Sequence, residues 1–129
     1  MHESFDGNKL FFSSGGCLNT DIHMIDLQGG IESPVAGMPR VATDDLWTVG
    51  RNGIYFVPAD GSTVWSYFFV PADGSNVSYF DLATKKFHQV FRSPRGFGHG
   101  LALSPDERFI LYALPSKERA DIMLMENYR

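Results

Sequence analysis

The sequence is poor in several features that would define a function. It has one cysteine, Cys17, and can therefore form no internal disulfide bond. It has no apolar run of roughly 18 residues or more, the length of a transmembrane helix, so membrane insertion is not expected. Its opening residues, MHESFDGNKL, lack the basic and apolar regions of a signal peptide. These absences leave the cellular compartment open.

Basic residues are also scarce. The 129 residues include 11 Lys and Arg against 15 Asp and Glu, which gives a formal net charge of −4. Nucleic-acid backbones are bound through basic surfaces. We therefore do not expect this chain to bind nucleic acid.

Helical periodicity is missing as well, whereas short apolar and aromatic runs bounded by turn residues are frequent. Such runs are typical of β-strands. Many short, evenly spaced strands indicate a sandwich, a barrel or a propeller. The predicted strands are Lys9–Ser13, Ile22–Leu27, Ile54–Val57, Val77–Leu82, Phe109–Ala113 and Ile122–Met125, with weaker ones at Leu46–Val49, His88–Phe91 and Leu101–Leu103.

Two sets of similar segments reveal a long repeat. In the first set, which starts at residues 4, 49 and 104, the apolar anchors lie 44 and 56 residues apart. In the second set, which starts at residues 21, 76 and 121, the anchors lie 55 and 45 residues apart. The anchors are Leu10, Ile54 and Ile110 in the first set, and Ile22, Val77 and Ile122 in the second.

A short duplication explains why the intervals differ. The hexapeptide VPADGS occurs at Val57–Ser62 and again at Val70–Ser75, an offset of 13 residues. The longer interval in each set spans this duplication, and without it every interval is 42 to 45 residues. A repeat of this length that holds four short strands is typical of a β-propeller blade. We interpret residues 57–75 as a tandem duplication within one blade.

The expected fold is therefore all-β, a partial β-propeller of about two and a half four-stranded antiparallel blades. The predicted units are a partial blade over residues 1–36, a blade with the duplication over 44–92, and a blade without its outer strand over 99–127. We expect the chain to open at the second strand of one blade and to close at the third strand of another. This would make it a fragment, an assembly subunit or the tail of a larger protein.

The repeating unit resembles the blade of TolB-type six-bladed propellers. Ser4–Gly7 (SFDG) and Ser104–Glu107 (SPDE) match the first part of the blade motif, and Asp21–Ile22 and Asp121–Ile122 match the second. Glu107 departs from the motif by replacing the usual turn glycine, and residues 50–53 (GRNG) replace the S-P-D-G turn of the middle blade. The ending resembles the last blade of propellers appended to bacterial winged-helix regulators and to some serine/threonine kinases.

Few residues suggest chemistry. No histidine pair has metal-ligand spacing, Asp44 and Asp45 alone cannot fill a calcium site, and no nucleophile motif is present, so we expect no metal, no cofactor and no catalytic residue. His99, within GFGHG, is a candidate ligand-binding residue because loops of this kind line the channel of a propeller, although the glycines also suit a tight turn. Asp6, Asp26, Asp81 and Asp106 are expected to cap turns.

The sequence thus favours a non-catalytic propeller segment that acts as a protein-binding or ligand-sensing module of a larger bacterial protein. The alternative is the non-catalytic gating propeller of a prolyl-oligopeptidase-type peptidase. The expected partners are another protein or the remaining propeller blades. We also expect the isolated chain to self-associate, because an incomplete ring exposes apolar faces and unpaired strand edges.

Overall fold

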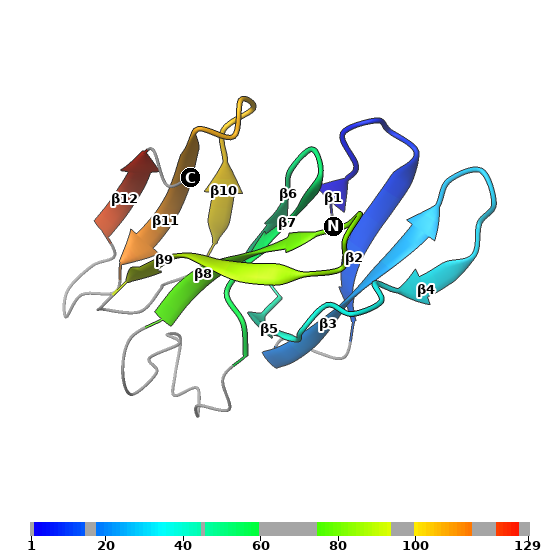
Figure 1. The fold of residues 1–129 in the computed structure, drawn as a ribbon, viewed down its shortest axis with the longest axis horizontal. Helices are drawn as coiled ribbons and strands as arrows, with labels where there is room; N and C mark the ends of the chain where they lie inside the picture. Colours follow the sequence, from blue (N-terminus) through cyan, green and yellow to red (C-terminus); the bar gives the residue numbers. More distant parts are fainter. Residues whose placement is uncertain are drawn as a thin grey trace.

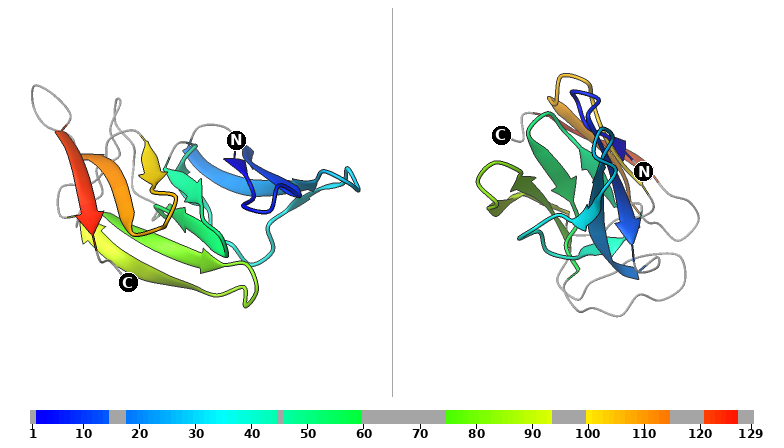
Figure 2. Two further views of the ribbon diagram at one scale, coloured as in Figure 1. Left: turned by 90° about the horizontal axis from the view of Figure 1, so that it is seen from above. Right: turned by 90° about the vertical axis from the view of Figure 1, so that its right-hand side faces the viewer.

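The computed structural model describes residues 2–14, 18–44, 46–59, 75–93, 100–114 and 121–126. Every regular element in these ranges is a β-strand, in agreement with the all-β prediction. These ranges contain no helix long and apolar enough to cross a membrane. The strands form three antiparallel sheets, which lie side by side in chain order (Figures 1 and 2).

Each sheet is a meander in which consecutive strands pair. The first sheet contains β1 (His2–Glu3), β2 (Lys9–Ser14), β3 (Leu18–Asp26) and β4 (Glu32–Pro34), and β5 (Val41–Thr43) pairs with the opening residues of β3. The second sheet contains β6 (Trp47–Val49), β7 (Gly53–Phe56), β8 (Ser75–Asp81) and β9 (Phe87–Ser93). The third contains β10 (Leu101–Leu103), β11 (Phe109–Leu114) and β12 (Asp121–Glu126).

The first strands of the three sheets lie together. Strand β6 contacts both β1 and β10, so the sheets approach one another along these strands. This is how the inner strands of propeller blades are arranged around a common axis. The first sheet begins with the short strand β1, so the expectation that the chain opens at the second strand of a blade was wrong. The predicted blade boundaries stay a prediction.

All nine strands predicted from the sequence are present, with ends that shift by a few residues. Three further strands, β1, β4 and β5, were missed. Each has only two or three residues, too few for an alternation of apolar and polar side chains to show. Strand β4, Glu-Ser-Pro, contains no residue type that favours strands. The extended conformation of β4 is therefore stabilised by its pairing with β3.

The duplicated segment joins two strands that remain neighbours. Strand β7 pairs directly with β8, from Gly53 opposite Asp81 to Phe56 opposite Ser78, so the linking residues insert no strand between them. At the start of the link, Val57 is fully buried and Pro58 forms a β-bridge with Val41. Residues 60–74, which hold half of the first VPADGS copy, most of the second copy and Trp65, lie outside the described residues. The turns expected there stay a prediction.

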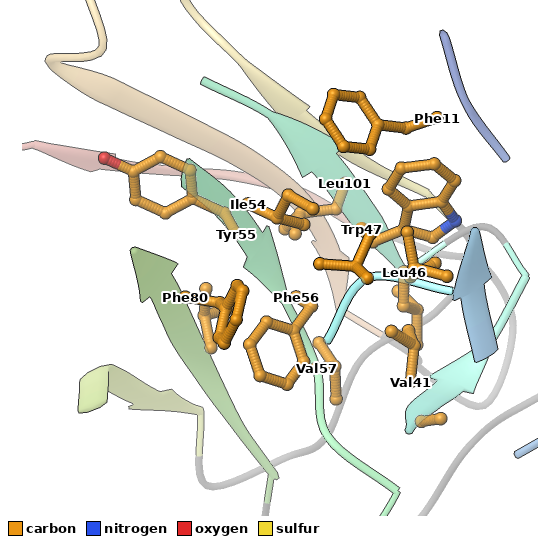
Figure 3. Packing of buried hydrophobic residues seen from close by; sticks show 14 of the residues in the cluster. Phe11, Val41, Leu46, Trp47, Ile54, Tyr55, Phe56, Val57, Phe80 and Leu101 are labelled. Carbon is orange, nitrogen blue, oxygen red and sulfur yellow. The ribbon is translucent and has the colours of Figure 1, made fainter. Parts of the chain in front are cut away.

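The hydrophobic core surrounds strand β7 of the second sheet (Figure 3). All four residues of β7 are buried, which is typical of a strand covered on both faces. Phe11 packs into the core from the first sheet, and Ile110 from the third. Trp47, whose place the sequence left open between core and channel, is 1% exposed, and its indole N–H donates to the carbonyl oxygen of Asp44 at 3.0 Å.

The outer face of the third sheet carries apolar side chains without a sheet against them in the described chain. Ile110 points into the core, so its neighbours Phe109 and Leu111 point to the opposite face. Ala102 lies there too, as the cross-strand partner of Leu111. Leu111 is 41% exposed and helps to line an apolar hollow of about 310 Å³. In a closed propeller, a neighbouring blade would cover such a face.

This exposed face predicts self-association of the isolated chain. Leu111→Lys should weaken association about tenfold or more, because burying a leucine contributes about 1.5 to 3 kcal/mol and a lysine ammonium resists burial. Sedimentation velocity over micromolar concentrations measures the effect. Leu27→Lys is the matched control, since Leu27 is 53% exposed in the turn before β4 and should leave association unchanged. A monomeric parent chain, or equal effects of both variants, would contradict the prediction.

The direct pairing of β7 with β8 predicts that the duplication is dispensable. Deleting Thr63–Ser75 leaves one VPADGS copy before Asn76, with Ser62 in the place of Ser75 at the start of β8. The shorter link reduces the entropic cost of closing the loop between β7 and β8. The deletion also removes TVWSYFFV, an uncharged segment prone to aggregation. We expect an unchanged or higher melting temperature and less aggregation, measured by circular dichroism and light scattering. A lower melting temperature with loss of sheet signal would show that the segment is structural.

Candidate functional site

The turns before β2 and β11 share one hydrogen-bond pattern. In both, a serine hydroxyl donates to the aspartate two residues later, from Ser4 to Asp6 and from Ser104 to Asp106, each at 2.7 Å. The same aspartate oxygen accepts the backbone N–H two residues further on, at 3.0 and 3.1 Å. The structure therefore confirms that Asp6 and Asp106 cap turns.

Asp26 and Asp81 cap the turns after β3 and β8. Each accepts two backbone N–H groups, from the second and third residues that follow it, at 2.8 and 3.2 Å. The hydrogen bond from Ser4 lowers the pKa of Asp6, and the bond from Ser104 lowers the pKa of Asp106. Backbone bonds from Gln28 and Gly29 lower the pKa of Asp26. These aspartates have structural roles.

Glu107 differs from its counterpart in the first sheet. It has a φ of 59° at the position where Gly7 has 75°, and a non-glycine residue in this left-handed region costs roughly 1–2 kcal/mol. Glu107 is nevertheless buried, with 8% of its surface exposed, and its side chain reaches the second sheet. One carboxylate oxygen accepts the backbone N–H of Arg51 at 3.3 Å, and the other accepts the Tyr55 hydroxyl at 3.5 Å. A side chain at Gly50 would collide with this carboxylate.

Three rings lie in a row beside Glu107 across the second sheet. Tyr55, Tyr79 and His88 are successive cross-strand partners on β7, β8 and β9. Their ring centroids are 4.8 Å apart between the tyrosines and 5.8 Å apart between Tyr79 and His88. Gly53 leaves room for this row, because a side chain there would collide with the Tyr79 ring. The Tyr55 hydroxyl points away from the buried cluster (Figure 3).

The carboxylate and the rings border a cleft of about 750 Å³. The second and third sheets meet at β6 and β10, and the cleft opens on the side of β7, β8 and β9, facing the turn before β11. Among the described residues, it combines aromatic surface, hydrogen-bonding groups and two carboxylates. The lining residues are Arg51, Asn52, Tyr55, Tyr79, His88, Gln89, Val90, Asp106 and Glu107.

The cleft was not predicted from the sequence. The one sequence feature that pointed to it was Glu107, which replaces the usual glycine of the turn motif. The sequence-predicted ligand residue, His99, lies outside the described residues, as do Cys17 and Asp45. Asp44 is exposed. Within the described ranges, no group of three or more His, Cys, Asp or Glu side chains is placed to hold a metal ion.

Comparisons with known proteins support the fold. No protein-family model and no curated protein matches the sequence. The structure resembles that of TolB from Acinetobacter baumannii, with a TM-score of 0.59 and 12% identity over 93% of this chain and 28% of that chain. It also resembles a putative TolB from Agrobacterium tumefaciens, with a TM-score of 0.60 and 14% identity over 98% of this chain and 44% of that chain. The chain thus has a TolB-like propeller fold and spans less than half the length of either structure.

The backbone at Glu107 predicts an unusual order of stability. Glu107→Ala removes the carboxylate and keeps a side chain at positive φ, whereas Glu107→Gly removes the carboxylate and relieves the strain. We expect the glycine variant to be more stable than the alanine variant by about 1 kcal/mol. Urea denaturation of the two variants measures this difference. Equal stability, or a more stable alanine variant, would contradict the conformation described for this turn.

The turn aspartates predict a loss of stability in acid. Their pKa values are lower in the folded chain than the ordinary value of 3.8, so their stabilisation is present above that pH. It is lost as the pH falls through the folded-state values. The triple variant Asp6→Asn, Asp26→Asn, Asp106→Asn keeps an acceptor oxygen at each turn but cannot titrate. Urea denaturation from pH 7 to pH 3 should therefore show a shallower acid decline for the variant, and parallel curves would contradict the assignment.

Proposed function

We propose that this chain is a non-catalytic segment of a bacterial propeller protein and that it binds a protein partner in the cleft between its second and third sheets. The supporting observation is the cleft itself, in which Tyr55, Tyr79 and Arg51 line one hollow. Tyrosine and arginine are enriched at the energetic centres of protein interfaces. The TolB-like fold supports a propeller scaffold, and the site carries the functional argument.

The larger protein is part of the proposal. The end of the sequence resembles propellers on winged-helix regulators and serine/threonine kinases, and partner binding or ligand sensing would suit such a module. The remaining blades would cover the outer face of the third sheet. The partner cleft lies on the opposite side of that sheet and would stay available.

A site-directed crosslink tests the partner site. A photoreactive phenylalanine analogue replaces His88, which is exposed on β9 within the cleft, and the chain is irradiated in a lysate of its source organism. We expect one protein to crosslink at position 88 and not at position 27, the matched exposed position in the turn before β4. Equal capture at both positions, or none at position 88, would contradict the proposal.

Affinity measurements then confirm the captured protein as a partner. The purified partner should bind the parent chain, and His88→Ala should weaken binding several-fold without changing the circular dichroism spectrum, because His88 is exposed and outside the core. Leu27→Ala serves as the control. Unchanged affinity of the His88 variant would place the interface elsewhere.

A further inference from the structure

Strand β9 forms the outer edge of the second sheet, and it borders the cleft. It pairs with β8 alone among the described strands, and its residues His88, Gln89 and Val90 line the hollow. The outer strands of the other two sheets, β4 and β12, contribute no described residue to that lining. Strand β4 is also poorly suited to further pairing, since it has three residues and ends at Pro34. A partner held in the cleft can therefore reach the edge of β9.

The hydrogen-bond register shows which main-chain groups of β9 face away from the sheet. The backbone N–H of Asp81 donates to the carbonyl oxygen of Lys86 at 2.8 Å, which makes these residues a hydrogen-bonded pair. Bonded and non-bonded pairs alternate along an antiparallel ladder. His88 therefore belongs to the next bonded pair, and the N–H and C=O groups of Phe87 and Gln89 point away from β8. Both of these residues are exposed, Phe87 to 54%.

A β-bulge limits the length of this edge. The pairing with β8 skips Val90, which is the additional residue of the bulge. The regular edge before the bulge is Phe87–Gln89. A bulge of this kind disfavours the long edge-to-edge pairing through which sheets aggregate. The edge therefore suits one short added strand.

Two lysines lie at the beginning of this edge. Lys85 and Lys86 are exposed and directly precede β9, and in the part of the chain that the structure describes neither forms an ion pair. Asp81, across the turn, accepts hydrogen bonds from the backbone N–H groups of two turn residues. Strand β9 itself, FHQVFRS, has no acidic residue. The start of the edge is thus basic, although the whole chain has a net charge of −4.

We infer that the partner binds through an extended, acidic segment that adds a strand to β9. This inference rests on the proposed function, because the added strand extends the second sheet along the border of the cleft. Main-chain hydrogen bonds to Phe87 and Gln89 hold the segment, and its carboxylates pair with Lys85 and Lys86. Alternate side chains of the added strand point the same way as His88, into the cleft.

A matched pair of peptides tests the charge of the segment. Both are acetylated and amidated hexapeptides rich in strand-forming residues, Glu-Val-Thr-Val-Thr-Glu and its counterpart Lys-Val-Thr-Val-Thr-Lys. Saturation-transfer NMR observes the peptide, so self-association of the chain does not prevent the measurement. We expect the glutamate peptide to bind about fivefold more tightly, with a preference that falls as salt is added. Equal binding of the two, or no binding of the glutamate peptide, would overturn the inference.

Two substitutions at Gln89 test the main-chain pairing. Gln89→Pro removes an N–H that points away from β8, a position where edge strands tolerate proline, and should weaken binding of the glutamate peptide about fivefold. Gln89→Val keeps the N–H and should preserve binding. Circular dichroism checks that both variants retain the sheet. Equal affinity of the two folded variants would contradict pairing at β9. If Gln89→Pro instead abolishes self-association and the peptide does not bind, a second copy occupies the edge and the inference is wrong.

Two double variants locate the charge contact, and they decide the question even if the proline variant does not fold. Lys85→Gln with Lys86→Gln should abolish the preference for the glutamate peptide. Lys9→Gln with Arg40→Gln removes the same charge from exposed positions of the first sheet and the loop that follows it, and should preserve the preference. Loss of the preference in both double variants, or in neither, would reject the lysine contact. A partner captured at position 88 through a helical or basic segment would leave the proposed function intact and reject the inference.

Discussion

The structure depends on the burial of strand β7 from both sides. Ile54 and Phe56 are fully buried and Tyr55 is 2% exposed, so successive side chains of one strand are covered on opposite faces. The first sheet supplies Phe11 and Ile22 to this core, and the third supplies Leu101 and Ile110. A single sheet of three or four short strands would have no such cover. The three sheets therefore stabilise one another through the middle one.

This constraint also explains where the cleft lies. The sheets are held together at their first strands, where β6 contacts β1 and β10, and the opening lies on the side of the later strands β8 and β9. Glu107 reaches across near the start of this opening, with a backbone conformation that glycine would adopt more easily. Strain retained at one position beside a hollow is common at functional sites. The same carboxylate links the second and third sheets and borders the cleft.

Much of the fold could be predicted from the sequence because its determinants are local. The strand runs and the turn aspartates are patterns within a few residues, and both are matched in the structure. The short strand β4 was not predicted, because it is stabilised by pairing with β3 and its own residues do not favour a strand. The cleft escaped because it depends on register: Tyr55 and Tyr79 become neighbours only when β7 pairs with β8 across the duplicated segment. Glu107 and Tyr55 are 52 residues apart in the chain, so only tertiary structure brings them together.

Hydrogen exchange of the backbone amides tests the central claim, the burial of β7 between the outer sheets, most directly. Amides in the most buried strand open only with the whole structure, whereas strands at the margins open locally. Measured by mass spectrometry at neutral pH, the peptide that covers Gly53–Val57 should be the slowest to exchange, slower than peptides from β2 and β11. Fast exchange in this peptide, with slower exchange in either outer sheet, would contradict the account.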